Sequence, residues 1–302
     1  MTNAFRITQR TVTTTMLNGL QSNLGRLQKL QEQLSSGKQV SRPSDSPVKT
    51  VESLQFRSNI RRTEQYVRNA DDGLAMLGTT DAALTTSLDR TARARELVLQ
   101  GLNDTNNDEG RAALATELRT LRDGLVSIAN TRYLDRAVFA GNSASANAFS
   151  SPGATYQGDS GEVLRSVAPG VDVAVNVSGD DVFGADGDPT QLFRVLDELA
   201  SALETGGTTM HGRLTTGLTG LDTAVSRVIS TLGLIGARTN RLESVKDTAE
   251  GQLINLTSSL SEVEDIDLPK TIVELQMQEV AYKAALGATA RAVQPSLLDF
   301  LR

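Results

Sequence analysis

Apolar residues recur every three or four positions in four long stretches of this chain. Such spacing is typical of amphipathic helices that bury one stripe against partner helices. The stretches run over residues 17–34, 56–102, 225–263 and 268–293. The third is far longer than an average helix of roughly 11–12 residues, so it requires partners along its whole length.

Two shorter apolar repeats, in residues 114–128 and 192–203, predict helices that join or cap the long ones. The polar stretch 103–108 predicts a loop between helices. Pro295 is expected to end or kink the last helix, since proline removes a backbone donor and clashes with the preceding turn.

Proline also marks three predicted helix starts. In each case a residue that can cap a helix N-terminus precedes a proline, which suits the first turn. The capping residues are Ser46, Asp188 and Asp267, and Gln191 would complete a capping box with Asp188.

Residues 142–188 differ in kind, because they are rich in Gly, Ser, Asp and Pro. Valines alternate with other residues from Val171 to Val177, the period of a strand with one buried face. Residues 163–167 form a second strand candidate, and Pro169-Gly170 is the turn between the two. A small β insert is therefore expected between helical regions.

These patterns predict a mainly α fold, an elongated rod in which the first helix pairs with the last and the second long helix with the third. The helices would form a terminal coiled coil and a bundle that carries the small central β insert. The terminal coiled coil is expected to consist of residues 1–43 and 265–302. The bundle is expected to consist of residues 44–141 and 189–264, and the β insert of residues 142–188.

The two ends of the chain are the candidate assembly interface. The expected seam between the first and last helices comprises Leu17, Leu20, Leu24, Leu27, Leu34, Ile272, Leu275, Tyr282, Leu286 and Val293. Further apolar residues would stay exposed beside it, namely Met16, Leu30, Val273, Met277, Val280 and Ala284. Exposed apolar positions on a paired helix imply additional neighbours, and hence a ring or polymer subunit. An ordinary four-helix protein is the alternative that periodicity alone leaves open.

The composition removes several other classes. The net charge of −6 among 302 residues lacks the basic surplus of a nucleic-acid-binding protein. Without cysteine, the chain can have no disulfide or thiolate site, and no stretch reaches the roughly 18 uninterrupted apolar residues of a membrane span. The start of the chain is polar and has no acidic residue before Glu32, which also suits a transit peptide. The helical repeat begins within that same segment and favours a structural role.

Candidate chemistry is sparse, and no catalytic, metal or cofactor site is expected. His211 is the only histidine and lies in an expected glycine-rich loop. The acidic run 180–188 lacks the spacing and closing Glu of an EF-hand, and the glycine-rich run 206–220 lacks the ending of a phosphate loop. Arginines at 90, 93 and 95 are expected to form a solvated or interchain salt-bridging face.

Specific residues resemble the flagellin family. Leu34-Ser35-Ser36-Gly37 is similar to its N-terminal signature, and residues 264–301 are similar to its terminal helix. Two further motifs resemble the hook-associated subgroup that joins hook and filament: Arg42-Pro43-Ser44-Asp45 with Pro47, and Val138-Phe139-Ala140-Gly141. The chain departs from the family at Ser46, where an acidic residue often precedes the proline.

This resemblance, which covers residues 1–140 and 215–302, implies a structural subunit needed for flagellar assembly and motility. It implies export through the flagellar channel, with a cytoplasmic chaperone on the C-terminal helix, and a final place outside the cell. The implied partners are further copies of the chain, the first hook-associated protein and flagellin. A filament subunit is the first alternative, and a helical scaffold or sensor domain with no flagellar role is the second.

Overall fold

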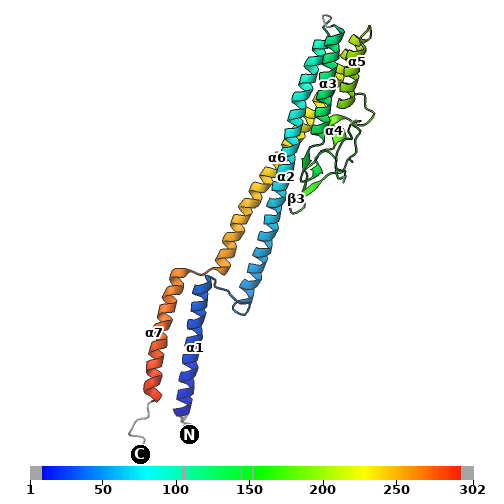
Figure 1. Ribbon diagram of the computed structural model, residues 1–302. Helices are drawn as coiled ribbons and strands as arrows, with labels where there is room; N and C mark the ends of the chain where they lie inside the picture. Colours follow the sequence, from blue (N-terminus) through cyan, green and yellow to red (C-terminus); the bar gives the residue numbers. More distant parts are fainter. Residues whose placement is uncertain (1–8, 104–106, 144, 152, 294–302) are drawn as a thin grey trace, which may run out of the picture. The chain divides into compact units, whose positions relative to one another are not determined.

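The computed structural model describes residues 9–103, 107–143, 145–151 and 153–293. These residues form seven helices and two two-stranded antiparallel sheets (Figure 1). In chain order the elements are α1 (Gln9–Ser36), α2 (Pro47–Gly101), α3 (Asp108–Ala129), β1 (Arg132–Tyr133), β2 (Arg136–Ala137), β3 (Leu164–Ala168), β4 (Val171–Ala174), α4 (Gly179–Phe183), α5 (Leu192–Thr205), α6 (Met210–Glu264) and α7 (Leu268–Val293). The predicted mainly α fold with a small central β part is confirmed.

The chain divides into two compact units. Unit 1 consists of Met1–Arg61 and Leu253–Arg302, and unit 2 of Arg62–Gln252. Unit 1 is thus built from both ends of the chain, whereas unit 2 is one continuous segment. The five-part division proposed from the sequence stays a prediction.

Two of the three predicted helix starts are confirmed. Ser46 precedes α2, and its hydroxyl accepts a hydrogen bond from the amide of Lys49 at 3.4 Å. Asp267 precedes α7, and its carboxylate accepts from the amide of Lys270 at 3.1 Å. Both side chains satisfy amides that a helix N-terminus leaves without an intrahelical partner.

The predicted start at Asp188 was wrong. Helix α5 begins at Leu192, and Gln191, in the capping position, makes no side-chain capping bond. Asp188 instead accepts from the amide and hydroxyl of Thr190, at 2.7 and 2.8 Å, and pairs with Arg227 at 2.9 Å. It therefore stabilises a turn, with an arginine of α6 attached to it.

The expected loop around His211 was also wrong, because α6 already begins at Met210. Glycines in its first turns serve close packing against α5. A Cβ on Gly217 would lie 2.4 Å from a methyl of Leu199, and one on Gly220 would lie 3.0 Å from a methyl of Val195. Gly206 and Gly207, which indicated the loop, lie before α6 with positive φ, whereas Gly217 and Gly220 lie within it and permit the close approach of two helices.

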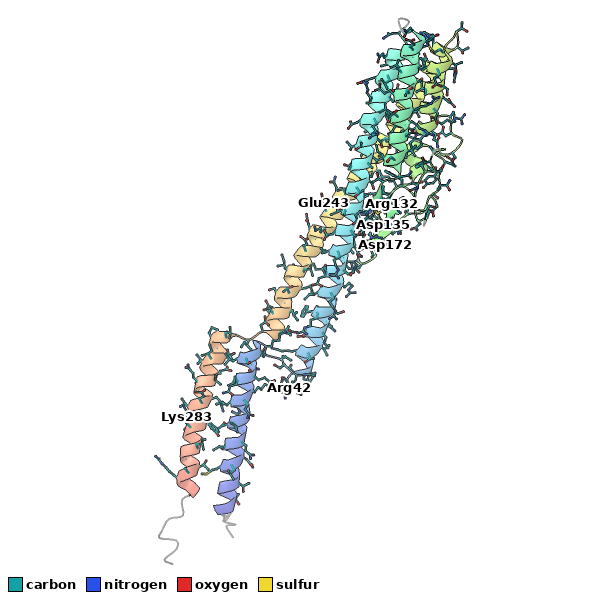
Figure 2. The ribbon with its side chains drawn as sticks, in the orientation of Figure 1. Arg42, Arg132, Asp135, Asp172, Glu243 and Lys283 are labelled. Carbon is teal, nitrogen blue, oxygen red and sulfur yellow. The ribbon has the colours of Figure 1, made fainter. Side chains whose placement is uncertain are left out.

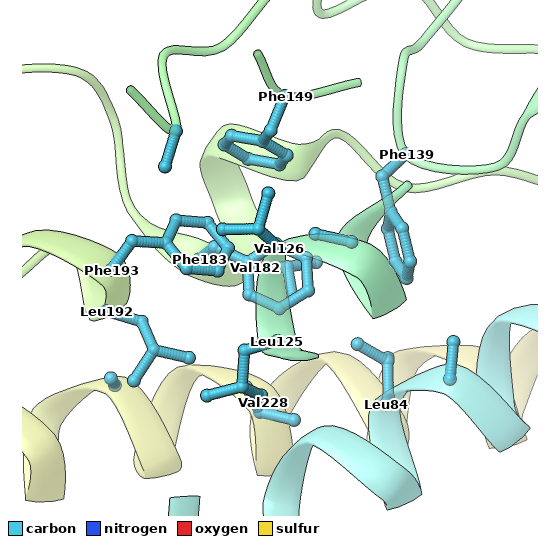
Figure 3. Close-up of a cluster of buried hydrophobic side chains, with 14 of the residues drawn as sticks. Leu84, Leu125, Val126, Phe139, Phe149, Val182, Phe183, Leu192, Phe193 and Val228 are labelled. Atoms are coloured by element: carbon cyan, nitrogen blue, oxygen red, sulfur yellow. The ribbon is translucent and has the colours of Figure 1, made fainter. Parts of the chain in front are cut away.

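Unit 2 contains a large buried core to which α2, α3, α5 and α6 all contribute. Its centre is an aromatic cluster, in which Phe149 lies 5.1 Å from Phe193 and 5.6 Å from Phe183 between ring centroids (Figure 3). Phe139 packs edge-on against Phe183 at 5.3 Å. All four phenylalanines are fully buried, so four of the seven phenylalanines of the chain stabilise this one place.

The two sheets attach to α2 through one carboxylate. In the predicted hairpin, β3 pairs with β4 with Arg165 opposite Val173, and the turn contains Gly170. Asp72 of α2 binds Arg165 at 2.7 Å and accepts from the hydroxyl of Tyr133 at 3.1 Å. The short hairpin of β1 and β2 was not predicted from the sequence. Both hairpins are held to the same turn of α2.

Candidate assembly surface

Helices α1 and α7 lie side by side within unit 1 (Figure 1). The amide group of Gln278 donates to the backbone carbonyl of Asn23 at 3.2 Å and to its side-chain oxygen at 3.3 Å. The predicted pairing of the first and last helices is confirmed.

The residues of the predicted seam fall into two groups. Half-buried side chains are Leu20, Leu24, Leu27, Leu34, Leu275 and Tyr282. Exposed side chains are Leu17, Ile272 and Leu286, and the side chain of Val293 lies outside the described residues. Leu286 is too exposed for its truncation to cost what a buried leucine costs in the single chain.

The face of α7 that meets α1 is shifted from the predicted one. Thr271, Gln278 and Ala285 occupy covered positions beside Leu275 and Tyr282. The face is shifted because the polar side chain of Gln278 forms hydrogen bonds with Asn23 of α1. Met16 and Leu30 of α1 are half-buried, so their predicted exposure was wrong.

This shift leaves an apolar face of α7 uncovered by α1. Val273, Met277 and Val280 are exposed by 53%, 60% and 67%. Leu268, Ile272 and Leu286 are exposed as well. Val273, Met277 and Val280 lie on one side of the helix, and we call these three residues the outer face of α7. Ala284 is also exposed, and Lys283 projects from the same helix (Figure 2).

The buried side chains of unit 1 are polar or charged, not hydrophobic. Among its described residues, no hydrophobic side chain is fully buried, and the buried residues are Ser53, Glu264 and Thr271. All fully buried hydrophobic side chains of the described chain belong to unit 2. Unit 1 therefore lacks the closed apolar core that normally stabilises a folded unit.

A carboxylate cluster, which the sequence did not reveal, lies where the two ends of the chain meet. Glu264, the last residue of α6, is 4% exposed. Its carboxylate accepts from Lys38 at 2.6 Å, from Arg57 at 2.8 Å and from the hydroxyl of Ser53. Two backbone hydrogen bonds lie beside the cluster. The amide of Gln39 donates to the carbonyl of Glu264 at 2.6 Å, and the amide of Ile266 donates to the carbonyl of Gly37 at 3.1 Å.

The cluster keeps Glu264 ionised. Burial alone would raise its pKa, but the hydrogen bonds from Arg57, Lys38 and Ser53 outweigh burial and lower the pKa to about 2. A buried carboxylate needs this set of donors, because an unpaired buried charge is strongly destabilising.

The family-like residues before α2 form a capped turn. Asp45 accepts from the amide of Arg42 at 3.0 Å and from Lys29 of α1 at 3.0 Å, and Arg42 pairs with Glu32 at 3.2 Å (Figure 2). The hydrogen bonds from Lys29 and Arg42 lower the pKa of Asp45. Pro43 and Ser44 lie within the turn, and Pro47 begins α2.

The second family-like motif is structural too. Phe139 belongs to the aromatic cluster, and its carbonyl accepts from the hydroxyl of Tyr156 at 2.9 Å. Gly141 has φ +67°, and a Cβ there would lie 2.1 Å from the carbonyl oxygen of Asp159. Only glycine fits this position.

Side chains considered for other chemistry have structural roles in the described chain. A ring nitrogen of His211 lies 3.2 Å from the carbonyl of Leu102. Asp186 accepts from the amides of Tyr156 and Gln191, and the described residues contain no group of three or more suitable metal ligands.

The arginines of α2 pair within the chain. Arg93 binds Glu117 of α3 at 2.8 Å, and Arg95 binds Asp222 of α6 at 3.0 Å. They link helices of unit 2 to each other.

Helix α6 is long and apolar enough to cross a membrane by length and composition, with a best window of mean hydropathy 1.2. A core helix of a soluble protein meets the same test. Leu214, Leu221 and Leu242 of α6 are fully buried in the core of unit 2, and 33% of the apolar window is buried.

Comparison with known proteins identifies the family. Residues 7–144 match the bacterial flagellin N-terminal helical region, and residues 218–301 match the bacterial flagellin C-terminal helical region. Together these matches cover well over half of the chain. The chain belongs to the flagellin family.

Flagellar hook-associated proteins and flagellins are both similar to this chain. Flagellar hook-associated protein 3 of Escherichia coli K12 is 25% identical over 90% of this chain and 92% of its own length. Flagellin of Bacillus subtilis 168 is 28% identical over 98% of this chain and 100% of its own length.

The fold agrees as well. The crystal structure of flagellar hook-associated protein-3 from Legionella pneumophila superimposes with a TM-score of 0.61 at 17% identity, over 70% of this chain and 98% of that one.

Proposed function

We propose that this chain is a structural, non-enzymatic subunit of the bacterial flagellum that joins the hook to the filament. The observation that carries the proposal is the uncovered outer face of α7, in a unit whose described residues include no fully buried hydrophobic side chain. Copies that pack these faces together would supply the apolar core that unit 1 lacks. Repeated contacts of this kind generate rings or helical tubes.

Two observations favour a junction subunit over the filament subunit. The capped turn at Arg42–Pro47 and the motif ending in Gly141 are similar to the hook-associated subgroup. Hook-associated protein 3 is also among the relatives aligned over nearly the whole chain. The Bacillus subtilis flagellin, aligned over as much, keeps the filament subunit as the second candidate.

The proposed partners follow from this role. They are further copies of the chain in a ring, the first hook-associated protein on the hook side and flagellin on the filament side. A cytoplasmic export chaperone would cover α7 before export, and the mature protein would lie outside the cell. Neither nucleic acid, membrane insertion nor a cofactor enters the proposed function.

A paired substitution on α7 tests the assembly surface. Met277 and Val280 are exposed, so replacing both with Ser should change the stability of the single chain by no more than about 0.5 kcal/mol per site. Incorporation into flagella, measured by immunoblotting of sheared filaments, should nevertheless be lost. The matched control replaces the exposed polar residues Gln276 and Lys283 with Ser. Normal incorporation of the Met277→Ser/Val280→Ser variant would refute the proposed surface.

Deletion of the gene separates the junction role from its alternatives. A junction subunit is required to retain filaments, so the deletion strain should keep its hooks and release flagellin into the medium. Filaments that stay attached would contradict the junction role. A filament subunit would be indicated if this chain were the bulk protein of sheared filaments. A cytoplasmic scaffold would be absent from both sheared and secreted fractions.

A further inference from the structure

The apolar contacts between α1 and α7 do not define how the two helices align along their axes. The covered face of α1 presents Leu20, Leu27 and Leu34, which lie seven residues apart. A shift of one heptad, about 10 Å along the helix, would again place leucines opposite the covered face of α7. Some other feature has to select one alignment.

The buried residues of unit 1 provide such a feature. Glu264 and Ser53 are buried and bonded to each other, and Lys38 and Arg57 complete the set of donors. Glu264 belongs to α6, Ser53 and Arg57 belong to α2, and Lys38 follows α1. Buried polar groups of this kind can select one alignment, because misalignment leaves them unpaired.

The position of the cluster in the chain connects it to both helices. Lys38 lies two residues after the end of α1, and Glu264 lies four residues before the start of α7. The backbone bonds from Gln39 and Ile266 tie the same two connections together. A heptad shift would pull Lys38 away from Glu264 and break both backbone bonds.

We infer that Glu264 is a positioning residue, which sets the register of α1 against α7 through Lys38, Arg57 and Ser53. The hydrogen bonds between Gln278 and Asn23 add a second polar contact farther along the pair. The register determines which side chains of α7 face α1 and which remain on its outer face. In this respect the inference deepens the proposed function and relies on it, but the register itself is a property of the single chain.

Cross-linking can measure the register directly, because the chain contains no cysteine. The pair Asn23→Cys/Gln278→Cys reports the observed alignment and also removes the second polar contact, so that Glu264 acts alone. Asn23→Cys/Ala285→Cys and Met16→Cys/Gln278→Cys report a heptad shift in either direction. A short bifunctional thiol reagent is applied to the purified full-length chain, and the products are quantified by gel electrophoresis and mass spectrometry.

In the parent chain, the observed-alignment pair should cross-link at least roughly tenfold more than either shifted pair. Glu264→Gln keeps the side-chain shape but removes the charge, so it should lower this preference by roughly tenfold. Ser53→Ala, a milder change, should lower it in the same direction. Asp265→Asn is the matched control, because it removes an exposed neighbouring carboxylate and should leave the preference unchanged.

Thermal unfolding of unit 2 in each variant shows that the chain is folded. An unchanged register preference in both Glu264→Gln and Ser53→Ala would overturn the inference, as would a parent chain that cross-links equally in all registers. Since these measurements require no flagellum, they can fail while the proposed function holds. Conversely, a chain with the predicted register that does not assemble would contradict the proposed function alone.

Discussion

At the residue scale, the carboxylate of Glu264 is held ionised by three side chains, and its pKa of about 2 lies below the ordinary value of 4.5. A lowered folded-state pKa contributes stability that is fully present above pH 4.5 and is lost as the pH falls toward 2. A shift of this size corresponds to about 3 kcal/mol. The protection factors of the α1 and α7 amides, obtained by comparing each hydrogen-exchange rate with the intrinsic rate at the same pH, should therefore fall over this pH range. Glu264→Gln should remove most of this pH dependence, and a variant that retained it would contradict the assignment.

The second prediction at this scale concerns backbone conformation and steric fit at Gly141, not charge. Ala at this position would need a strained positive φ and would place its Cβ against the carbonyl of Asp159. Gly141→Ala should destabilise unit 2 by about 2–3 kcal/mol in denaturant unfolding. Gly78→Ala is the control, since Gly78 lies inside α2 with open space around it and should gain slightly in stability. Equal effects of the two changes would contradict this account.

The structural roles of some residues could be predicted from the sequence, and those of others could not. Ser46 and Asp267 were predictable as caps, because a capping bond joins residues three positions apart. The partners of Glu264 lie more than two hundred residues away in the chain, so no local pattern points to them. Only the resemblance to the flagellin family drew attention to the segment that contains it.

At the scale of elements, the central insert is more deeply integrated than its composition suggested. Removal of residues 145–185 should be strongly destabilising, because Phe149 and Phe183 belong to the aromatic cluster of unit 2. Valines of the insert are buried as well, including Val173 and Val175. A glycine-rich segment can therefore be a large contributor to a core.

Truncation of one ring measures this contribution. Phe149→Ala should destabilise unit 2 by about 3–5 kcal/mol, since the ring is fully buried against three other aromatic side chains. The measurement is denaturant unfolding followed by circular dichroism. Leu121→Ala is a useful comparison within unit 2, because that leucine of α3 is only half-buried and should cost less. A loss below about 1 kcal/mol for Phe149→Ala would show that the cluster is not a core.

Helices were predictable where the apolar repeat was regular, as in α1 and in most of α2 and α6. The first turn of α6 was missed because it directly follows Gly206 and Gly207, which lie before the helix with positive φ and are typical of a loop. The covered face of α7 was predicted incorrectly because the sequence pattern considers only apolar side chains. Gln278 contacts α1 through hydrogen bonds instead. The β3–β4 hairpin was found because its valines alternate and its turn contains a glycine.

At the scale of the whole molecule, the two units differ in the source of their stability. Unit 2 has an extensive buried core, whereas unit 1 depends on half-buried contacts and on the Glu264 cluster. In the purified monomer, amides of α1 and α7 should exchange with solvent much faster than those of α3 and α5. Incorporation into flagella should slow the exchange of α1 and α7, because neighbours would cover the outer face. Equal protection of both units in the monomer would contradict this difference.

Because unit 1 draws on both ends of the chain, it can be completed only by an intact polypeptide. A copy truncated at either end could still fold the continuous segment that makes unit 2. Such a copy would lack one helix of the α1–α7 pair. If subunits join through unit 1 as proposed, fragments of the chain would be excluded from the growing structure, because none of them could form the complete unit.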